Sequence, residues 1–366
     1  MMTGLKALII KELLSYLRDP KSRMTLIIPP LMQLLIFSYA ATLDINNVDL
    51  VVLNHDNGTY SREVIERVSA GGFISHIETV STEAELKQAI DERRALAALR
   101  FQADFSRRLL AGTPAEMQVI LDGRRANSAQ VAQNYFSAIV ADINREIHPV
   151  IESQPQLEIR NWYNPNLIYQ WFIVPALVGT LAMASSLIIC ALSIAREREM
   201  GTFEQLLVAP TTPLAVIIGK MIPALIVGSS LGCVMIAAGV LLFRIPFTGS
   251  LPLLLLGLVV FIISVVGIGL MISSICSTQQ QAILGTFSVI VPLILLSGFA
   301  TPVENMPELL QAVSEANPLK HFLVIVQGSF LKSLSPKEVF LAIRPMFLIF
   351  FVTFTLAVVF VRKNLQ

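Results

Sequence analysis

Residues 251–275 read LPLLLLGLVVFIISVVGIGLMISSI and contain no Asp, Glu, Lys, Arg or His. A helix needs about 20 apolar residues to cross the roughly 30 Å hydrocarbon core of a membrane. Charged side chains are costly at that depth, so an uninterrupted apolar run of this length predicts a membrane-spanning helix. This stretch therefore sets the fold class, which is that of an α-helical polytopic membrane protein.

Five further stretches have the same character, and the cores of all six lack ionisable residues. The six predicted spans cover residues 24–43, 170–195, 214–243, 251–275, 282–300 and 340–361. Prolines within them predict kinks, because neighbouring helices can satisfy the freed carbonyls. The whole chain is 54% hydrophobic and 14% charged, whereas a typical soluble domain has about 25% charged residues. Residues 301–339 are expected to form short external or re-entrant helices.

The segment 44–169 differs from the rest, because residues 44–165 hold more than half of all charged residues. Its patterns alternate between strands and helices, which predicts an inserted α/β domain with a mixed sheet. The predicted strands are 48–53, 73–80, 95–101 and 117–121, and the predicted helices are 62–68, 81–94, 105–110 and 128–147. The three cysteines, Cys190, Cys233 and Cys276, lie in or beside apolar segments, so this domain has no disulfide framework.

Lys and Arg in the short connections set the orientation, because cytoplasmic loops are enriched in them. They concentrate in residues 1–23, in the connection 196–213 and in the C-terminal tail. Both termini are therefore expected in the cytoplasm and the α/β domain outside it. Residues 1–23 resemble an interfacial helix, although Glu12 interrupts its apolar face. A cleaved signal peptide is the alternative for residues 1–40, but the apolar run is long for that.

Several functional classes find little support in the residues. A net charge of +1, without a basic stripe, gives no indication of nucleic-acid binding. The four histidines lack metal-ligand spacing, and a solvated turn is favoured over a catalytic pair for His55 and Asp56. Gly219–Lys220 lacks the first glycine of a phosphate loop, so a separate polypeptide is expected to hydrolyse any ATP. Span cores without ionisable groups also argue against an ion-coupled carrier.

The connection after the second span is the most informative segment. Residues 196–210 read REREMGTFEQLLVAP, which mixes dense charge with an apolar patch. A charged helix end at the membrane surface would explain this pattern. A docking helix that enters a groove on a cytosolic partner would explain it as well.

This connection, together with motifs along almost the whole chain, resembles the ABC-2 type transport permeases of bacterial multidrug exporters. The supporting motifs are Ile218–Lys220, Ser273–Gln281, Leu296–Gly298, Pro302–Pro307, Asn317–Pro318, His321–Phe322, Leu121–Gly123 and Arg160–Pro165. The resemblance implies a non-catalytic permease subunit of an ATP-driven exporter for drug-like or amphiphilic substrates, located in the bacterial inner membrane. An ion-coupled efflux carrier, or a membrane receptor with a periplasmic ligand-binding domain, is the alternative.

The resemblance also implies partners and site residues. The chain would pair with a second permease, as a homodimer or heterodimer, and with a cytosolic ABC ATPase that holds ATP and Mg. It would need no cofactor of its own and would contact membrane lipids, while a periplasmic adaptor is one of several open roles for the external domain. The implied ATPase-coupling residues are Arg196, Glu197, Arg198, Glu199, Gly201, Thr202, Phe203, Glu204, Leu206 and Leu207. Gly228 and Gly232 have the G-x-x-x-G spacing that permits close helix packing.

Overall fold

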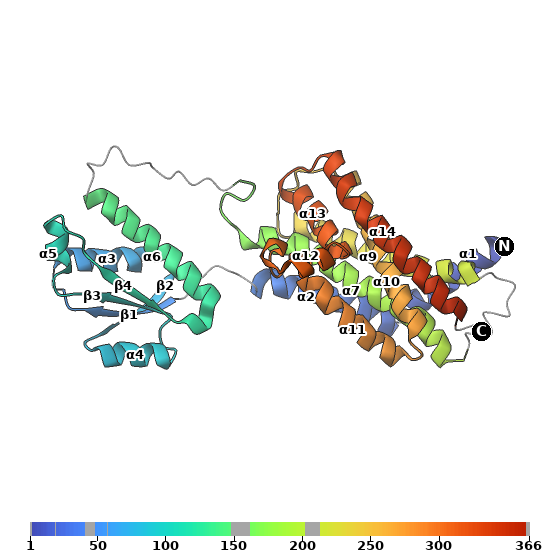
Figure 1. Ribbon diagram of the computed structural model, residues 1–366, viewed down its shortest axis with the longest axis horizontal. Coiled ribbons are helices and arrows are strands. Elements are labelled where there is room, and N and C mark those ends of the chain that lie inside the picture. The colour runs from blue at the N-terminus through green and yellow to red at the C-terminus, as the bar shows by residue number, and fades with distance from the viewer. Residues whose placement is uncertain are drawn as a thin grey trace. The chain divides into compact units, whose positions relative to one another are not determined.

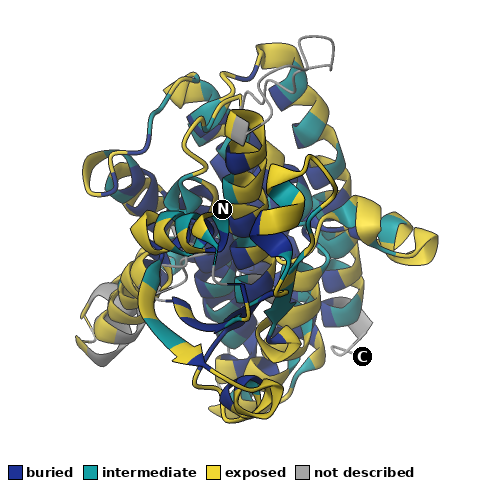
Figure 2. Cartoon of the chain, turned by 90° about the vertical axis from the view of Figure 1, so that its left-hand side faces the viewer, coloured by how far each residue is buried: buried dark blue, intermediate teal, exposed yellow. Residues whose placement is uncertain are grey.

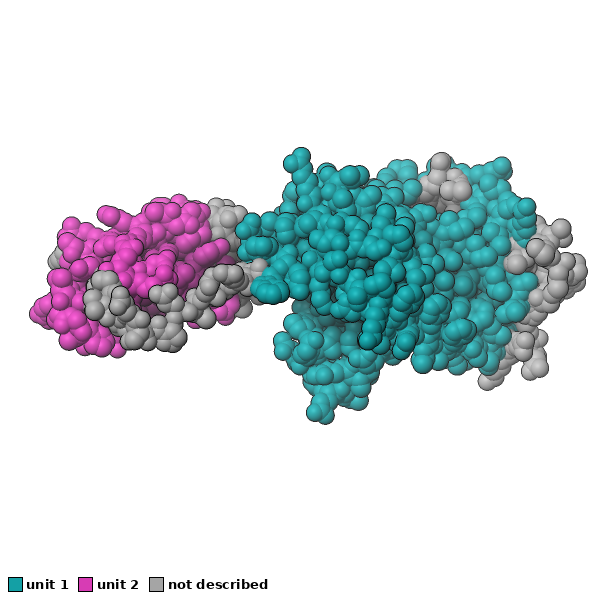
Figure 3. All heavy atoms as spheres, turned by 90° about the horizontal axis from the view of Figure 1, so that it is seen from above, with its two compact units in different colours: residues 1–41, 161–366 teal, residues 42–160 magenta. Residues whose placement is uncertain are grey.

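The computed structural model describes residues 2–18, 20–40, 48–56, 58–147, 162–201 and 213–363. The chain folds into two compact units (Figures 1 and 3). Unit 1 comprises Met1–Ala41 and Asn161–Gln366, and unit 2 comprises Thr42–Arg160. Unit 1 is helical and unit 2 is an α/β structure, so the α/β segment is inserted into the sequence of a helical bundle.

Unit 1 contains the apolar helices. They are α1 (Met2–Arg18), α2 (Pro20–Ala40), α7 (Tyr169–Glu199), α9 (Pro213–Leu241), α10 (Leu251–Ile275), α11 (Gln279–Leu295), α12 (Glu308–Ser314), α13 (Pro318–Leu331) and α14 (Pro336–Lys363). Among the described residues, four helices are long and apolar enough to cross a membrane: α7, α9, α10 and α14. The apolar parts of α2 and α11 are shorter, at Ile27–Tyr39 and Gln279–Leu295. Unit 1 therefore has the helices of an integral membrane protein.

The bounds of several helices differ from the sequence expectation. The second helix begins at Pro20 rather than at residue 24, because proline suits the first turn of a helix, where its missing N–H is not needed. The helix α11 begins at Gln279, where the Thr278 hydroxyl accepts a hydrogen bond from the backbone N–H of Gln281. The last helix starts at Pro336 and so includes the end of the segment expected to form re-entrant helices.

The centre of unit 1 is formed by α7 and α10, whose apolar stretches are 83% and 72% buried, whereas that of α14 is 28% buried. Figure 2 shows that buried residues lie in the interior and that exposed residues lie on outward-facing helix surfaces. The helix α13 packs against both central helices. The rings of Phe322 on α13 and Phe261 on α10 stack with centroids 4.4 Å apart. Asn317 caps α13 and donates a hydrogen bond to the Leu293 carbonyl on α11, which fixes the start of α13.

Unit 2 is built on a four-stranded sheet in the order β2-β1-β3-β4. The strands are β1 (Val48–Asn54), β2 (Ile74–Val80), β3 (Ala97–Phe101) and β4 (Met117–Leu121). β1 pairs in parallel with β2 and β3, whereas β4 pairs antiparallel to β3. The sheet is therefore mixed, as the alternation of strand and helix patterns predicts.

Helices cover both faces of this sheet (Figure 1). On one face, α3 (Thr59–Ala70), α5 (Phe105–Leu110) and α6 (Ala126–Ile147) pack against the sheet. On the other face, α4 (Glu83–Asp91) covers the sheet. Alternate residues of β1 and β3 point to opposite faces, so each face has its own apolar core. This three-layer arrangement gives unit 2 a core independent of the helical unit.

Candidate coupling site at the end of α7

The last turn of α7 holds four consecutive charged residues, 196–199. Helical geometry separates them: Glu197 is buried, whereas Arg196 and Glu199 are exposed. The helix ends where the N–H of Gly201 donates to the Arg198 carbonyl, and Gly201 has φ of +68°. Glycine suits this left-handed position because it has no Cβ, so the sequence itself stops the helix there.

A buried cluster of charges connects this turn to α9 and α1. The Lys220 ammonium on α9 donates to Glu197 Oε1 at 3.1 Å and to Glu12 Oε1 on α1 at 2.9 Å. Lys11 on α1 also donates to Glu197, at 3.3 Å. The Lys220 side chain is 1% exposed. These four residues, Lys11, Glu12, Glu197 and Lys220, are named the ion cluster below.

The ion cluster explains two features that the sequence left unexplained. Glu12 interrupts the apolar face of α1 because it is the partner of Lys220, and a buried ammonium needs such a partner. The pair Gly219–Lys220 belongs to helix packing, because Gly219 lies against Leu8 of α1 with no room for a Cβ. The sequence signal was an acid on the apolar face of α1 and a single lysine in the apolar helix α9, but its meaning depended on knowing that α1 and α9 are neighbours.

The other residues of this turn hold the ends of α10 and α11. Arg198 donates from Nη1 to the carbonyls of Ser274 and Cys276, at 3.0 and 3.2 Å. Glu199 accepts a hydrogen bond of 2.7 Å from the backbone N–H of Gln279, the first residue of α11. One turn earlier, the Ser273 hydroxyl donates to the Ala191 carbonyl of α7 at 2.6 Å. The end of α7 is thus bonded to four other helices.

The predicted coupling residues fall into two groups. Those from Arg196 to Gly201 form the end of α7, and the structure brings Glu197, Arg198 and Glu199 into contacts with other helices. The second group, Thr202, Phe203, Glu204, Leu206 and Leu207, lies outside the described residues. Lys11, Glu12 and Lys220 were not among the predicted site residues, although they complete the cluster.

This arrangement fixes both ends of the connection between α7 and α9. Glu197 stands at its start, Lys220 in the second turn after its end, and the two side chains touch. A buried pair of charges resists separation strongly, since removing one partner leaves the other desolvated at a cost of about 3–5 kcal/mol. Through Lys220 the cluster therefore joins α1, α7 and α9.

The glycines predicted for close helix packing lie between helices of unit 1. A Cβ at Gly228 would collide with the Ser186 hydroxyl of α7, and one at Gly232 would come within 2.8 Å of Leu258 on α10. Both glycines therefore let α9 approach its two neighbours closely. Such small residues at helix contacts are common in membranes, where packing replaces the hydrophobic drive between helices.

Unit 2 holds the second place where chemistry was considered. Asp56 is 5% exposed, so the expectation of a solvated turn was wrong for this residue. Burial alone would raise the pKa of Asp56. Hydrogen bonds to its carboxylate, including one of 2.5 Å from the Ser106 hydroxyl, outweigh burial and lower the pKa. Asp56 thus fastens the end of β1 to α5, a structural role.

Asp122, in the motif Leu121–Gly123, is a second buried acid of unit 2. It accepts a hydrogen bond of 2.8 Å from Arg124 Nε, and this hydrogen bond lowers the pKa of Asp122. Over the described parts of the chain, no three His, Cys, Asp or Glu side chains gather closely enough to hold a metal ion. His55 is exposed, and its backbone N–H donates to the Phe101 carbonyl.

The structure thus combines a unit of apolar helices, an inserted α/β unit and an ion cluster at the end of α7. Known proteins are similar to this sequence over almost its whole length. The chain matches the ABC-2 family transporter protein family over residues 21–359, and it belongs to that family. It is 42% identical over 364 residues, 98% of each chain, to the probable multidrug ABC transporter permease YbhR of Escherichia coli (strain K12). The inner membrane transport permease YhhJ of that strain is 30% identical over 339 residues, 87% of this chain and 86% of the relative.

Proposed function

We propose that this protein is the permease subunit of an ATP-driven ABC exporter, which moves drug-like or amphiphilic molecules out of the cytoplasm. Membership of the ABC-2 family supports transport as its role. The relatives YbhR and YhhJ are named as permeases, and YbhR as a probable multidrug transporter. A separate cytosolic ATPase supplies the energy, with ATP and Mg bound on that partner. A second permease, identical or related, completes the membrane part.

The ion cluster is the observation that carries the proposed coupling. The ATPase docks on residues 196–207, and closure of the ATPase on ATP displaces this segment. Because Glu197 and Lys220 join its two ends and Glu12 adds α1, the displacement moves three helices as one body. Such a body is the kind of two-state element that a nucleotide bound on a partner can bias.

The proposed topology has six spans, with α2 and α11 added to the four long helices. α2 has 21 residues, a length of about 30 Å at 1.5 Å per residue. α11 has 17 residues and is followed by the apolar residues Leu296 and Phe299. Six spans place both termini in the cytoplasm and unit 2 outside it, in agreement with the distribution of Lys and Arg.

A copurification experiment tests the coupling. The tagged chain is solubilised with its ATPase, and the ATPase recovered and its stimulated hydrolysis are both measured. Phe203→Ala and Glu204→Ala remove an apolar anchor and a charge, so each should lower both readouts by about tenfold, the effect of losing one good interface contact. Glu304→Ala, an exposed acid of the segment between α11 and α12, is the control and should change neither. Unchanged recovery and hydrolysis in both loop variants would exclude docking at this segment.

An ion-coupled carrier is the second candidate, because the ion cluster places ionisable groups in buried positions of α7 and α9. Its two acids and two lysines compensate one another, which favours a structural role over the binding of a transported ion. Proteoliposomes separate the two functions. Transport that needs ATP and the ATPase, and that survives a protonophore, supports the exporter, whereas transport driven by a proton gradient alone supports the carrier.

A further inference from the structure

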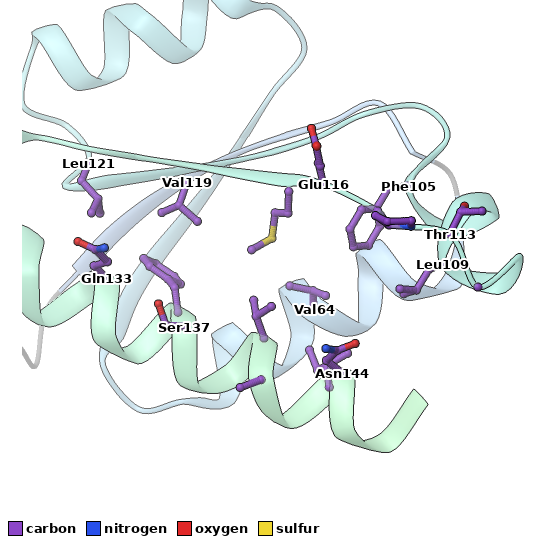
Figure 4. Close-up of a pocket in the computed structure, with 18 residues that line it drawn as sticks. Val64, Phe105, Leu109, Thr113, Glu116, Val119, Leu121, Gln133, Ser137 and Asn144 are labelled. Atoms are coloured by element: carbon purple, nitrogen blue, oxygen red, sulfur yellow. The ribbon is translucent and has the colours of Figure 1, made fainter. Parts of the chain in front are cut away.

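Unit 2 contains a large cavity on the sheet face covered by α3, α5 and α6 (Figure 4). Its volume is about 1070 Å³. The edge strand β4 forms one wall, α6 forms the opposite wall, and α5 with the following turn closes one end. The cavity lies within unit 2 and does not depend on unit 1.

The cavity exists because the edge strand is covered less completely than the central strands. On the same face, Leu50 of β1 and Leu99 of β3 are at most 1% exposed. Met117, Val119 and Leu121 of β4 are only partly buried, although they point to the same core. In Figure 4, Val119 and Leu121 point across the open space toward α6. The fold therefore leaves an apolar surface beside its core.

The lining combines an apolar floor with a neutral polar rim. Phe105, Phe136 and Val64 are buried at the floor. Gln133, Ser137 and Asn144 project from α6 at spacings of four and seven residues, so they follow one stripe of the helix. Glu116 is an acid on the rim near the start of β4, and it points away from α6 in Figure 4.

These features indicate a small amphiphile rather than a macromolecule. Sites for small molecules are concave and mostly apolar, have a few polar groups, and span roughly 300–1,000 Å³. A stable protein interface instead buries about 800 Å² on each partner over a broad surface. The neutral hydrogen-bonding groups suit a hydroxyl or amide, and the described residues that line the cavity include no Lys or Arg to pair with an anion.

We propose that this cavity is a binding site for an amphiphile with an apolar body and a neutral or singly cationic polar end. The apolar body lies against Met117, Val119 and Leu121, and the polar end reaches the stripe on α6. The proposal concerns unit 2 alone and goes beyond the exporter function. Because its test measures binding without ATP or ATPase, a failure of coupling and a failure of this site are distinguishable.

Photolabelling of the full chain in lipid nanodiscs tests the site. The probe is a dodecyl chain with a diazirine near its end and a hydroxyl head group, and mass spectrometry maps the labelled peptides. Saturable labelling of residues 113–121 and 133–144 is expected, with competition from unlabelled dodecanol. The corresponding probe with a carboxylate head should label about threefold less, because no Lys or Arg is present among the described lining residues to pair with the carboxylate. Equal labelling by the anionic probe would overturn the assignment of the polar end.

Two neighbouring residues of α6 provide a matched pair of variants. Ser137 lines the cavity, whereas Ala138 lies about 100° further around the helix and does not. Both are exposed, so a larger side chain is tolerated at either position. Ser137→Trp fills the cavity and should reduce saturable labelling by about tenfold through steric exclusion. Ala138→Trp should leave labelling unchanged.

A second pair guards against a general effect on folding. Asn144→Trp fills the other end of the stripe, and Arg145→Trp is its control on the adjacent face. Hydrogen exchange of β1 and β3 should be unchanged in all four variants. The proposal is overturned if labelling persists in both cavity variants, if it is lost equally in the controls, or if saturable labelling is confined to unit 1. Specific crosslinking of the cavity to a copurified polypeptide, with no saturable probe, would also overturn it.

Discussion

Replacing Lys220 by methionine probes the ion cluster most directly. Methionine keeps a long unbranched side chain and removes the ammonium group that lies between Glu12 and Glu197. The Glu12 carboxylate then loses its 2.9 Å partner in a side chain that is only 10% exposed. Glu197 loses its 3.1 Å contact but keeps Lys11 at 3.3 Å.

The free-energy cost of Lys220→Met follows from these contacts. One-sided loss of a buried ion pair costs about 3–5 kcal/mol, because the remaining charge stays desolvated. Lys11 is 61% exposed, so its pair with Glu197 contributes at most about 1 kcal/mol of compensation. The cost for Lys220→Met should therefore lie at the lower end, about 3 kcal/mol. Neutralising the acids as well, with Glu12→Gln and Glu197→Gln, should recover most of this loss.

Hydrogen exchange of the chain in nanodiscs measures the effect. The ion cluster holds α1 against α9, so its loss lowers the free energy of opening α1 and exposes the amides of that helix. A loss of 3 kcal/mol corresponds to about 100-fold faster exchange in peptides from α1. Lys332→Met is the control, because Lys332 and its partner Glu338 are both about half exposed and their pair contributes little.

Two results would refute this reasoning. Exchange of α1 within about twofold of the wild type would mean that the ion cluster does not hold this helix in place. An effect of Lys220→Met that is equally large in the Glu12→Gln, Glu197→Gln background would mean that packing, rather than charge, decides the loss.

Three further predictions concern both units. Asp56→Ala leaves the Ser106 hydroxyl without its acceptor in a buried place, so calorimetry of the full chain should show unit 2 destabilised by about 1–3 kcal/mol. Because the folded-state pKa of Asp56 is lowered, its stabilising contribution is present above its unfolded-state pKa and is lost as the pH falls through the folded value. The melting temperature of unit 2 should therefore fall below about pH 4. Asp56→Asn should weaken this dependence on pH, and an unchanged dependence would contradict the assignment. Gly228→Leu forces α9 away from α7 and should lower the thermal stability of unit 1, while Gly123→Leu, at a position with open space, should not.

The sequence contained much of the local structure. The apolar run of residues 251–275 coincides with α10, and the strand predicted for residues 117–121 coincides with β4. Length, hydrophobicity and period are local properties, so they can be read along the chain. The ends of the helices were not contained in the apolar pattern: α2 begins at Pro20, before the predicted span 24–43, and α14 begins at Pro336, before the predicted span 340–361.

The candidate site could be predicted only in part. The charged turn at residues 196–199 stood out, because it follows an apolar helix directly. The contacts of Lys220 with Glu12 and Glu197 could not be predicted, because Lys220 is 208 residues from Glu12 in sequence and 23 from Glu197. A lone Glu in an amphipathic helix and a lone Lys at the start of an apolar one have many explanations until the helices are known to touch.

The sequence alone determined that this chain is a membrane protein with an α/β insert, because apolar length and alternation depend on neighbouring residues. Tertiary structure decided which charges are buried together, as in the ion cluster, and that Asp56 is enclosed by Ser106 rather than solvated. It also left β4 partly uncovered beside α6. The physical reason is that burial and pairing are set by elements distant in sequence, whose packing geometry no local pattern contains.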